Sequence, residues 1–176
     1  MDMGNDRSGY TRTFAVPFTY EGREYPQMTF DFERLTGEDA IAIEKQMADE
    51  GIPFVRNEAT DGRYQLLCAS RASGIGDDAL TALPILDNLE IKAAARRYLM
   101  SGGGAEKDLS FTGFTGQTAE IIENELRAEG HTIAYAPAFD SRYTVKLAAR
   151  AMKKTEQEIR ELPLREFLGV KMATRF

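Results

Sequence analysis

The sequence has very little of several residue types, and each shortage excludes a class of structure or chemistry. Its 176 residues include one cysteine, one histidine and no tryptophan. The lone Cys68 excludes an internal disulfide and suits a reducing compartment, and its apolar neighbours predict a core position. The lone His131 leaves catalytic triads and zinc sites without their usual residues, so we expect a surface or loop histidine.

Long apolar runs, excess positive charge and cofactor motifs are also missing. No hydrophobic stretch approaches the roughly 18 residues that would cross a membrane. The net charge of −6 argues against nucleic acid or an anionic membrane as the main partner. Neither Gly74-x-Gly76 nor the Gly102–Gly104 run has the remaining residues of a nucleotide-binding loop. We therefore expect no enzyme activity, no cofactor and no metal.

One long stretch of the sequence occurs twice. Residues 32–97 align with residues 111–176 at a constant offset, without a gap. The aligned residues are identical at 21 of 66 positions, against about 6% by chance. The identities fall at positions 32, 36, 37, 40, 43, 44, 50, 51, 59, 61, 63, 64, 69, 71, 72, 83, 84, 89, 92, 94 and 96. We interpret the stretches as two tandem copies of one unit rather than a solenoid.

The pattern inside each copy predicts helices. Candidate N-cap residues precede the expected helices at Thr36, Asp61, Thr115, Asp140 and Thr155. Units this small bury only a marginal core alone, so we expect the copies to pack on each other. The fold class is therefore mainly α, with α+β character from a hairpin on the first unit. We expect the two tandem repeats of the small helical unit to be related by a pseudo-two-fold axis.

The segments outside the repeat differ from one another in composition. The first twelve residues are polar, lack a signal-peptide core and predict a loose tail. Residues 13–32 are rich in aromatic and β-branched side chains and have a Glu21-Gly22 turn, which predicts a β-hairpin. Glycines between the copies predict a flexible linker. The expected order is a tail, unit one, a linker and unit two, at residues 1–12, 13–100, 101–108 and 109–176.

Basic residues recur at helical spacing in both copies. Lys92 and Arg96 are one helical turn apart, as are Lys171 and Arg175. Like charges at this spacing mildly destabilise an isolated helix, so something should offset them. Acids on the first helices, such as Glu44, are one candidate, and an acidic partner is the other.

Two arginines lie within helices of otherwise small residues, at Arg71 and Arg150. Ion pairs with Asp61 and Asp140 are the simpler interpretation, and a shared role in partner binding is the alternative.

Apolar residues that differ between the copies are a further sign of a binding face. Such residues stand opposite a polar or smaller residue of the other copy, as in Ile41/Glu120, Ile121/Ala42 and Phe167/Asn88. If Ile41 and Phe167 are exposed they mark a contact surface, and if they are fully buried this surface is wrong. The candidate partner-binding residues are Ile41, Arg71, Lys92, Arg96, Ile121, Arg150, Phe167, Lys171 and Arg175.

Several motifs of the first copy resemble one protein family. They are Tyr20-Glu-Gly-Arg-Glu-Tyr-Pro-Gln-Met-Thr-Phe-Asp, Leu35-Thr-Gly-Glu-Asp-Ala, Arg63-Tyr-Gln-Leu-Leu, Ala69-Ser-Arg-Ala and the Leu83-Pro84 turn. Together they resemble the tail assembly chaperones of long-tailed phages and prophages, particularly the Mu-like kind. The resemblance covers residues 20–100 and extends to 111–176 as a degenerate copy. It departs from the family in having two units per chain.

The resemblance implies a non-enzymatic role. Such proteins bind the tape measure protein in the bacterial host cytoplasm and keep it soluble while the tail tube polymerises around it. They are not expected in the mature virion. The implied partner is the tape measure protein, with the tail tube protein as a second partner and a homo-oligomer compatible with both. The alternatives are a structural tail or connector protein and, less favoured, a small-ligand-binding protein or an enzyme.

Overall fold

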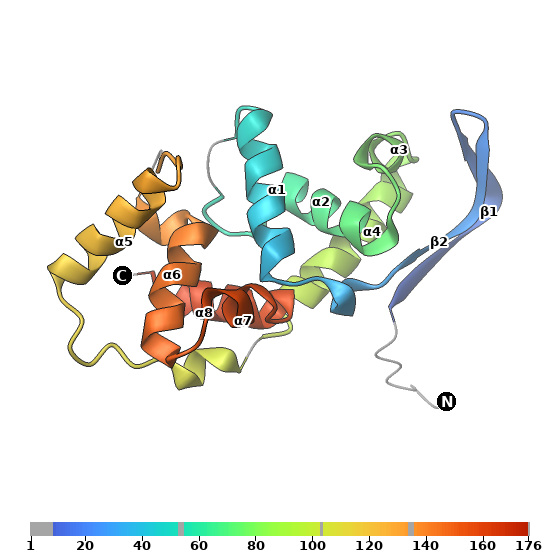
Figure 1. Ribbon diagram of the computed structural model, residues 1–176. Coiled ribbons are helices and arrows are strands. Elements are labelled where there is room, and N and C mark those ends of the chain that lie inside the picture. The colour runs from blue at the N-terminus through green and yellow to red at the C-terminus, as the bar shows by residue number, and fades with distance from the viewer. Residues whose placement is uncertain (1–8, 53–54, 103, 134–135, 176) are drawn as a thin grey trace, which may run out of the picture.

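The computed structural model describes residues 9–52, 55–102, 104–133 and 136–175, so the predicted tail lies mostly outside the described residues. The described chain is mainly helical with one antiparallel hairpin, as predicted (Figure 1). The first half contains β1 (Tyr10–Tyr20), β2 (Arg23–Phe30), a 3₁₀ turn η1 (Phe32–Arg34), α1 (Gly37–Asp49), α2 (Gly62–Ser73), α3 (Asp77–Thr81) and α4 (Ile85–Leu99). The second half contains η2 (Ala105–Asp108), α5 (Gly116–Ala128), η3 (Pro137–Phe139), α6 (Ser141–Met152), α7 (Glu156–Arg160) and α8 (Leu164–Ala173).

Helix positions in the two halves differ by one constant offset, which is the offset of the sequence alignment. Helices α5 to α8 begin at the positions that align with the starts of α1 to α4, and α5, α6 and α7 also end at aligned positions. The predicted caps explain the common starts. Asp61 and Asp140 accept hydrogen bonds from the backbone N–H groups of Arg63 and Arg142 at 2.9 and 2.8 Å. These bonds satisfy amides that the first helical turn leaves unpaired.

The hairpin begins earlier than the sequence suggested. Strand β1 starts at Tyr10, so the predicted tail boundary after residue 12 is wrong. Arg12 forms ion pairs with Asp87 and Glu90 on α4, which anchors the strand. A two-stranded sheet is marginal alone, and buried Phe30 of β2 adds it to the core.

The predicted flexible linker is also wrong in part. Residues 105–108 form the 3₁₀ turn η2, which packs against α8, and Ala105 is buried. The packing of this small side chain orders a segment whose glycines predicted flexibility. Gly103 lies outside the described residues.

The main hydrophobic core is shared by both halves. It contains Phe30, Tyr64 and Leu80 from the first half together with Leu164 and Phe167 from the second. A smaller separate cluster joins α5 to α6 through Ile122, Leu126, Tyr143 and Leu147. Figure 1 accordingly shows α5 at the end of the molecule opposite the hairpin. Within the described chain, no helix combines the length and the apolar character needed to cross a bilayer.

The halves meet through unlike surfaces. Helix α1 packs on α2 of its own half and on α6, α7 and α8 of the other half. A two-fold axis would place α5 against α2, α3 and α4 in the same way, whereas the main packing of α5 is on α6. The contact is therefore heterologous, and the pseudo-two-fold prediction is wrong. A match between two stretches of sequence does not fix the rotation that relates them in space.

Backbone hydrogen bonds form the centre of this joint. The Leu164 N–H donates to the Leu35 carbonyl at 2.8 Å, and the Gly37 N–H donates to the Leu162 carbonyl at 3.0 Å. A Cβ at Gly37 would lie 2.6 Å from the Phe167 ring. Only glycine therefore allows α1 to approach α8 this closely.

A buried ion cluster completes the joint. Lys171 is fully buried, and its Nζ lies 2.5 Å from Glu44 and 2.8 Å from Glu58. Arg175 adds a second cation 2.5 Å from Glu58. Burial alone would raise the pKa of Glu58, but Lys171 and Arg175 outweigh burial and hold it below its ordinary value. Glu58 is therefore ionised at neutral pH.

Candidate partner-binding groove

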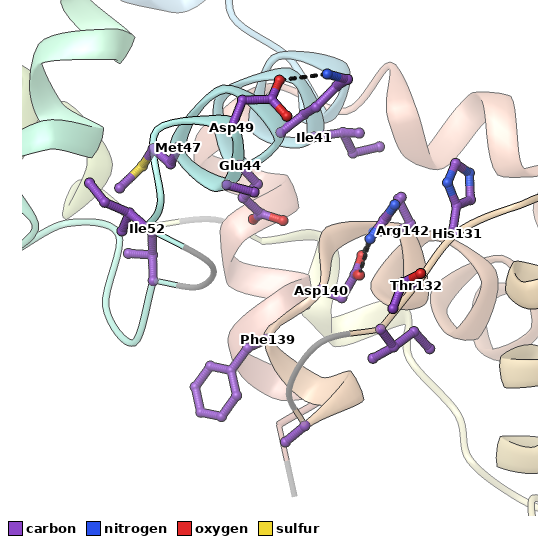
Figure 2. A pocket seen from close by; sticks show the side chains of 15 residues that line it. Ile41, Glu44, Met47, Asp49, Ile52, His131, Thr132, Phe139, Asp140 and Arg142 are labelled. Atoms are coloured by element: carbon purple, nitrogen blue, oxygen red, sulfur yellow. Dashed lines mark hydrogen bonds and ion pairs between the residues drawn. The ribbon is translucent and has the colours of Figure 1, made fainter.

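A groove of about 370 Å³ lies between the two halves, and we call it the inter-half groove (Figure 2). One wall is formed by α1 with Ile52 and Val55, and the other by residues 131–133 together with residues of 136–142. The walls include large apolar side chains. Ile41, Ile52, Ile133 and Phe139 are partly exposed, whereas Met47 and Val55 are buried. Ile52 and His131 occupy aligned positions of the two halves, so equivalent loops face each other across the groove.

The charged residues that line the groove are bonded within the protein. Glu44 accepts hydrogen bonds from the Ser141 N–H at 3.0 Å and from the Ser141 hydroxyl at 2.5 Å, besides its contact with Lys171. Asp140 and Arg142 form an ion pair at 2.5 Å, which Figure 2 shows in the groove. Burial alone would raise the pKa of Asp140, but Arg142 lowers it below its ordinary value. These groups stabilise the walls.

Polar groups mark the rim. Lys45 pairs with Asp49 at 2.6 Å, and the His131 Nε2 lies 4.0 Å from Glu129. His131 is in the loop after α5 with a side chain 40% exposed, as predicted. An apolar interior with a polar rim is the usual composition of a site that binds a partner or ligand. The arrangement can therefore accept apolar side chains.

The described chain has neither a candidate metal cluster nor an exposed cysteine. Among the described residues, no group of three or more His, Cys, Asp or Glu could hold a metal ion. Cys68 is fully buried in the core, as predicted, and burial raises the pKa of its thiol well above the ordinary value. This thiol is therefore protonated and sheltered from solvent.

Two of the predicted partner-binding residues are internal. Phe167 and Lys171 are both fully buried, so neither can contact a partner in this structure. Phe167 packs on Gly37, and Lys171 neutralises the acids of the joint. The proposed contact surface is thus wrong at these positions. The expectation that Glu44 would offset the repeated lysine is confirmed for Lys171.

The two arginines of the small-residue helices also have unexpected partners. Asp61 and Asp140, the predicted partners of Arg71 and Arg150, act instead as helix caps. The ion pairs found are Arg71–Asp39 at 3.4 Å and Arg150–Glu125 at 2.6 Å. Each arginine thus connects two helices of its own half, and neither lines the inter-half groove.

The remaining candidates are scattered over the surface. Arg175 lies 5.0 Å above the ring of Phe139, beside the groove. Ile41 is half-buried and is the one predicted residue among the described groove-lining side chains. Lys92 lines a separate hollow at the start of α4. The others at the surface are Arg96 and Ile121. The structure therefore does not gather the predicted residues into one site.

Most of the groove was missed by the sequence analysis. Met47, Ile52 and Phe139 gave no signal because apolar residues near helix ends are usually core. The two helix-ending glycines, Gly51 and Gly130, could have indicated it, since the loops that follow them occupy matched positions.

Comparisons with known proteins do not extend this description. No family model, curated protein or solved structure matches the chain. The function is therefore inferred from the groove and from the sequence motifs.

Proposed function

We propose that this protein is a non-enzymatic binding protein that holds a helical segment of its partner in the inter-half groove. The observation that carries the proposal is the groove itself, where partly exposed apolar side chains of both halves, such as Ile41 and Ile133, line a hollow whose charged residues are already paired. Grooves of this kind accept the apolar stripe of an amphipathic helix. The net charge of −6 favours a segment flanked by basic residues.

The proposed role is that of a phage tail assembly chaperone. The sequence motifs resemble that family, and the partner would be the tape measure protein, a long helical protein that needs protection before the tube forms around it. The tail tube protein is the second proposed partner. In this role the protein acts in the bacterial host cytoplasm and leaves before the virion is complete.

The proposal includes the origin of the chain as two tandem repeats, units 13–100 and 109–176. The 21 identities and the constant offset between the helix starts support it. Duplication would also give the groove its walls, because equivalent loops supply Ile52 and His131. A single unit could not form this groove alone.

A structural tail or connector protein is the second candidate. Large apolar side chains on α4 favour it, since Ile85, Leu86 and Leu89 are all exposed. Self-assembling proteins use such patches. A small-ligand-binding protein or an enzyme lacks comparable support, because Arg71 and Arg150 do not converge on one pocket.

Co-expression with a candidate tape measure protein tests the proposed function. The candidate is the longest helical protein encoded just downstream, produced alone and together with this chain. We expect it to be insoluble alone and soluble in a complex that survives pull-down. A candidate that neither binds nor gains solubility would overturn the chaperone role.

Groove variants then test the site. Thr132 is exposed and lines the groove, so Thr132→Trp fills the groove without removing an internal contact. Ile41→Asp places a charge on the opposite wall. The matched control is Ile121→Asp, an exposed position outside the groove. Both groove variants should lose the partner and the control should retain it, whereas equal binding by all three would place the contact elsewhere.

A further inference from the structure

The heterologous joint uses one face of each half. The α1 face comprises Leu35, Gly37, Glu38 and Glu44. The α8 face contacts the α1 face through the start of α6, the end of α7, the turn after α7 and the length of α8. Its contacting residues are Ser141, Arg160, Leu162, Leu164, Phe167 and Lys171. If both halves share one architecture, the first half also has a counterpart of the α8 face, and the second half also has a counterpart of the α1 face.

The first half has a hollow where the α8 face would have its counterpart. This hollow, of about 380 Å³, lies between the starts of α2 and α4 and the end of α3. Its lining residues are Gly62, Arg63, Leu66, Thr81, Leu83, Ile85, Asn88 and Lys92. The aligned positions of the second half are Ser141, Arg142, Val145, Arg160, Leu162, Leu164, Phe167 and Lys171. This set includes every contacting residue of the α8 face, so we call the hollow the α4 face.

The outer stripe of the α4 face, along α4 itself, is uncovered, although Leu66, Leu83 and Asn88 at the base of the hollow are buried. Leu164 on α8 is fully buried, whereas its counterpart Ile85 on α4 is 68% exposed. Leu168 is 7% exposed, whereas its counterpart Leu89 is 51% exposed. The hairpin does not cover this stripe, because Arg12 binds residues on the opposite side of α4 by helical geometry.

Helix α5 has the counterpart of the α1 face, which we call the α5 face. Phe114 on this face packs on the small α5–α6 cluster, but Gly116 is uncovered. A Cβ at Gly116 would meet nothing within 4 Å, whereas the matching Gly37 is covered by Phe167. Glu123 matches Glu44 and pairs along its own helix with Arg127 at 3.0 Å, rather than with a residue of another element. Gly116 and Glu123 therefore repeat the glycine and the glutamate of the joint, but Gly116 is uncovered and Glu123 pairs within its own helix.

The α4 face and the α5 face carry complementary charges. Lys92 on the α4 face matches Lys171 and has no ion pair within the described part of the chain. Placing α5 on the α4 face as α1 sits on α8 would bring Glu123 to Lys92 and Phe114 over Ile85. Arg160 and Glu38 pair in the joint, and their counterparts Thr81 and Gln117 are both uncharged, so no charge would be left unpaired there.

We infer that the α5 face of one molecule docks on the α4 face of a second copy, repeating the joint between the halves. Figure 1 shows α5 on one side of α1 and α3 on the other, so the contact forms between chains. A contact between unlike faces continues head to tail, into an open series or a ring. This inference concerns a different surface from the inter-half groove and does not depend on the proposed partner.

The contact between molecules is weaker than the joint within one molecule. Asn88 replaces Phe167, Glu120 replaces Ile41, and Pro137 stands where Glu58 supplies a carboxylate. These exchanges remove apolar area and one ion pair, and association also costs translational freedom. Assembly therefore grows with protein concentration and weakens with salt.

Sedimentation velocity of the full chain over a wide concentration range tests the inference. We expect the average mass to rise continuously with concentration, or to stop at a ring of three or more chains. Lys92→Glu and Glu123→Lys should each weaken self-association about tenfold or more by placing like charges in contact. An equimolar mixture of the two variants, or the double variant, should recover it because opposite charges meet again.

The control is Lys154→Glu, which makes the same charge change in the exposed loop between α6 and α7. It should leave self-association unchanged, and circular dichroism should show that all variants remain folded. Three results would overturn the inference. These are a monomer at every attainable concentration, association that both charge reversals leave intact, or a mass that stops at a dimer.

Discussion

Helices α1 and α5 have the same length and the same capping position but very different surroundings. Each has 13 residues and a threonine at the N-cap. Helix α1 lies in the shared core and packs on α2, α6, α7 and α8, whereas α5 packs mainly on α6 at one end of the molecule. The comparison shows that a helix's own sequence sets where it begins and ends, while the elements packed on it set how much it contributes to the stability of the fold.

Because identical residues stand at matched positions, this comparison can be tested by mutation. Lysine, glycine and glutamate recur at aligned positions of the two halves, once inside the joint and once at a free face. The same substitution can therefore be made in two environments of one protein, with the chemistry of the side chain held constant.

The largest difference is expected for the matched lysines. Lys171→Ala leaves Glu44 and Glu58 in the joint without their buried cation and should reduce the free energy of unfolding by about 3–5 kcal/mol. Lys92→Ala removes a charge at the surface and should stay within about 0.5 kcal/mol. Urea unfolding of dilute protein measures both. Similar losses for the two variants would show that the buried cluster contributes little.

The matched glycines should respond with opposite signs. Gly37→Ala places a Cβ 2.6 Å from the Phe167 ring and 3.1 Å from the Arg160 carbonyl, so we expect a loss of about 1–3 kcal/mol. Gly116→Ala meets nothing within 4 Å and should gain about 0.5–1 kcal/mol from the higher helix propensity of alanine. Thermal and urea unfolding both report the sign, and two gains would mean that Gly37 is not tightly packed.

The pH dependence of the free energy of unfolding should also differ between the matched positions of the two halves. The pKa of Glu58 in the folded protein is below its ordinary value of 4.5, so its contribution is present above pH 4.5 and is lost as pH falls through the folded pKa. The matched position in the second half is Pro137, which has no such group. Glu58→Gln should be less stable than the parent at neutral pH, and the difference should shrink in acid. A difference that is constant with pH would contradict the assignment.

The smallest effect is expected at the edge of the joint. Glu38 pairs with Arg160 at 3.0 Å with a side chain 63% exposed. Glu38→Gln, which copies the matched Gln117, should cost about 0.2–1 kcal/mol, and added salt should abolish the difference. The reverse change, Gln117→Glu, should be neutral because Thr81 offers no charge. A larger cost that persists in high salt would mean that this pair is effectively buried.

Local features of the fold were predictable, because they depend on residues close in sequence. Asp61 and Asp140 cap helices as expected, since a side chain and the amides a few positions ahead of it need no tertiary context. The hairpin and the core position of Cys68 followed from composition in the same way.

The relation between the halves was not predictable from the match alone. Two units of matching sequence can meet through like or unlike faces, and only the position of α1 against α8 decides between them. Phe167 was expected at a surface because the polar Asn88 stands at the matched position, but both side chains are buried, and the Asn88 amide donates to the Leu80 carbonyl at 2.9 Å. The inter-half groove was missed for the same reason, since it exists only once the halves are placed.

The hydrogen bond between Lys171 and Glu44 joins residues 127 positions apart, and this separation has a consequence for synthesis. While the chain is being made, the two carboxylates of the joint remain without their cation until α8 has left the ribosome. Closing so long a loop is slow relative to forming local helices. The first half therefore remains incompletely folded during synthesis, and the shared native core is completed only when α8 packs into it.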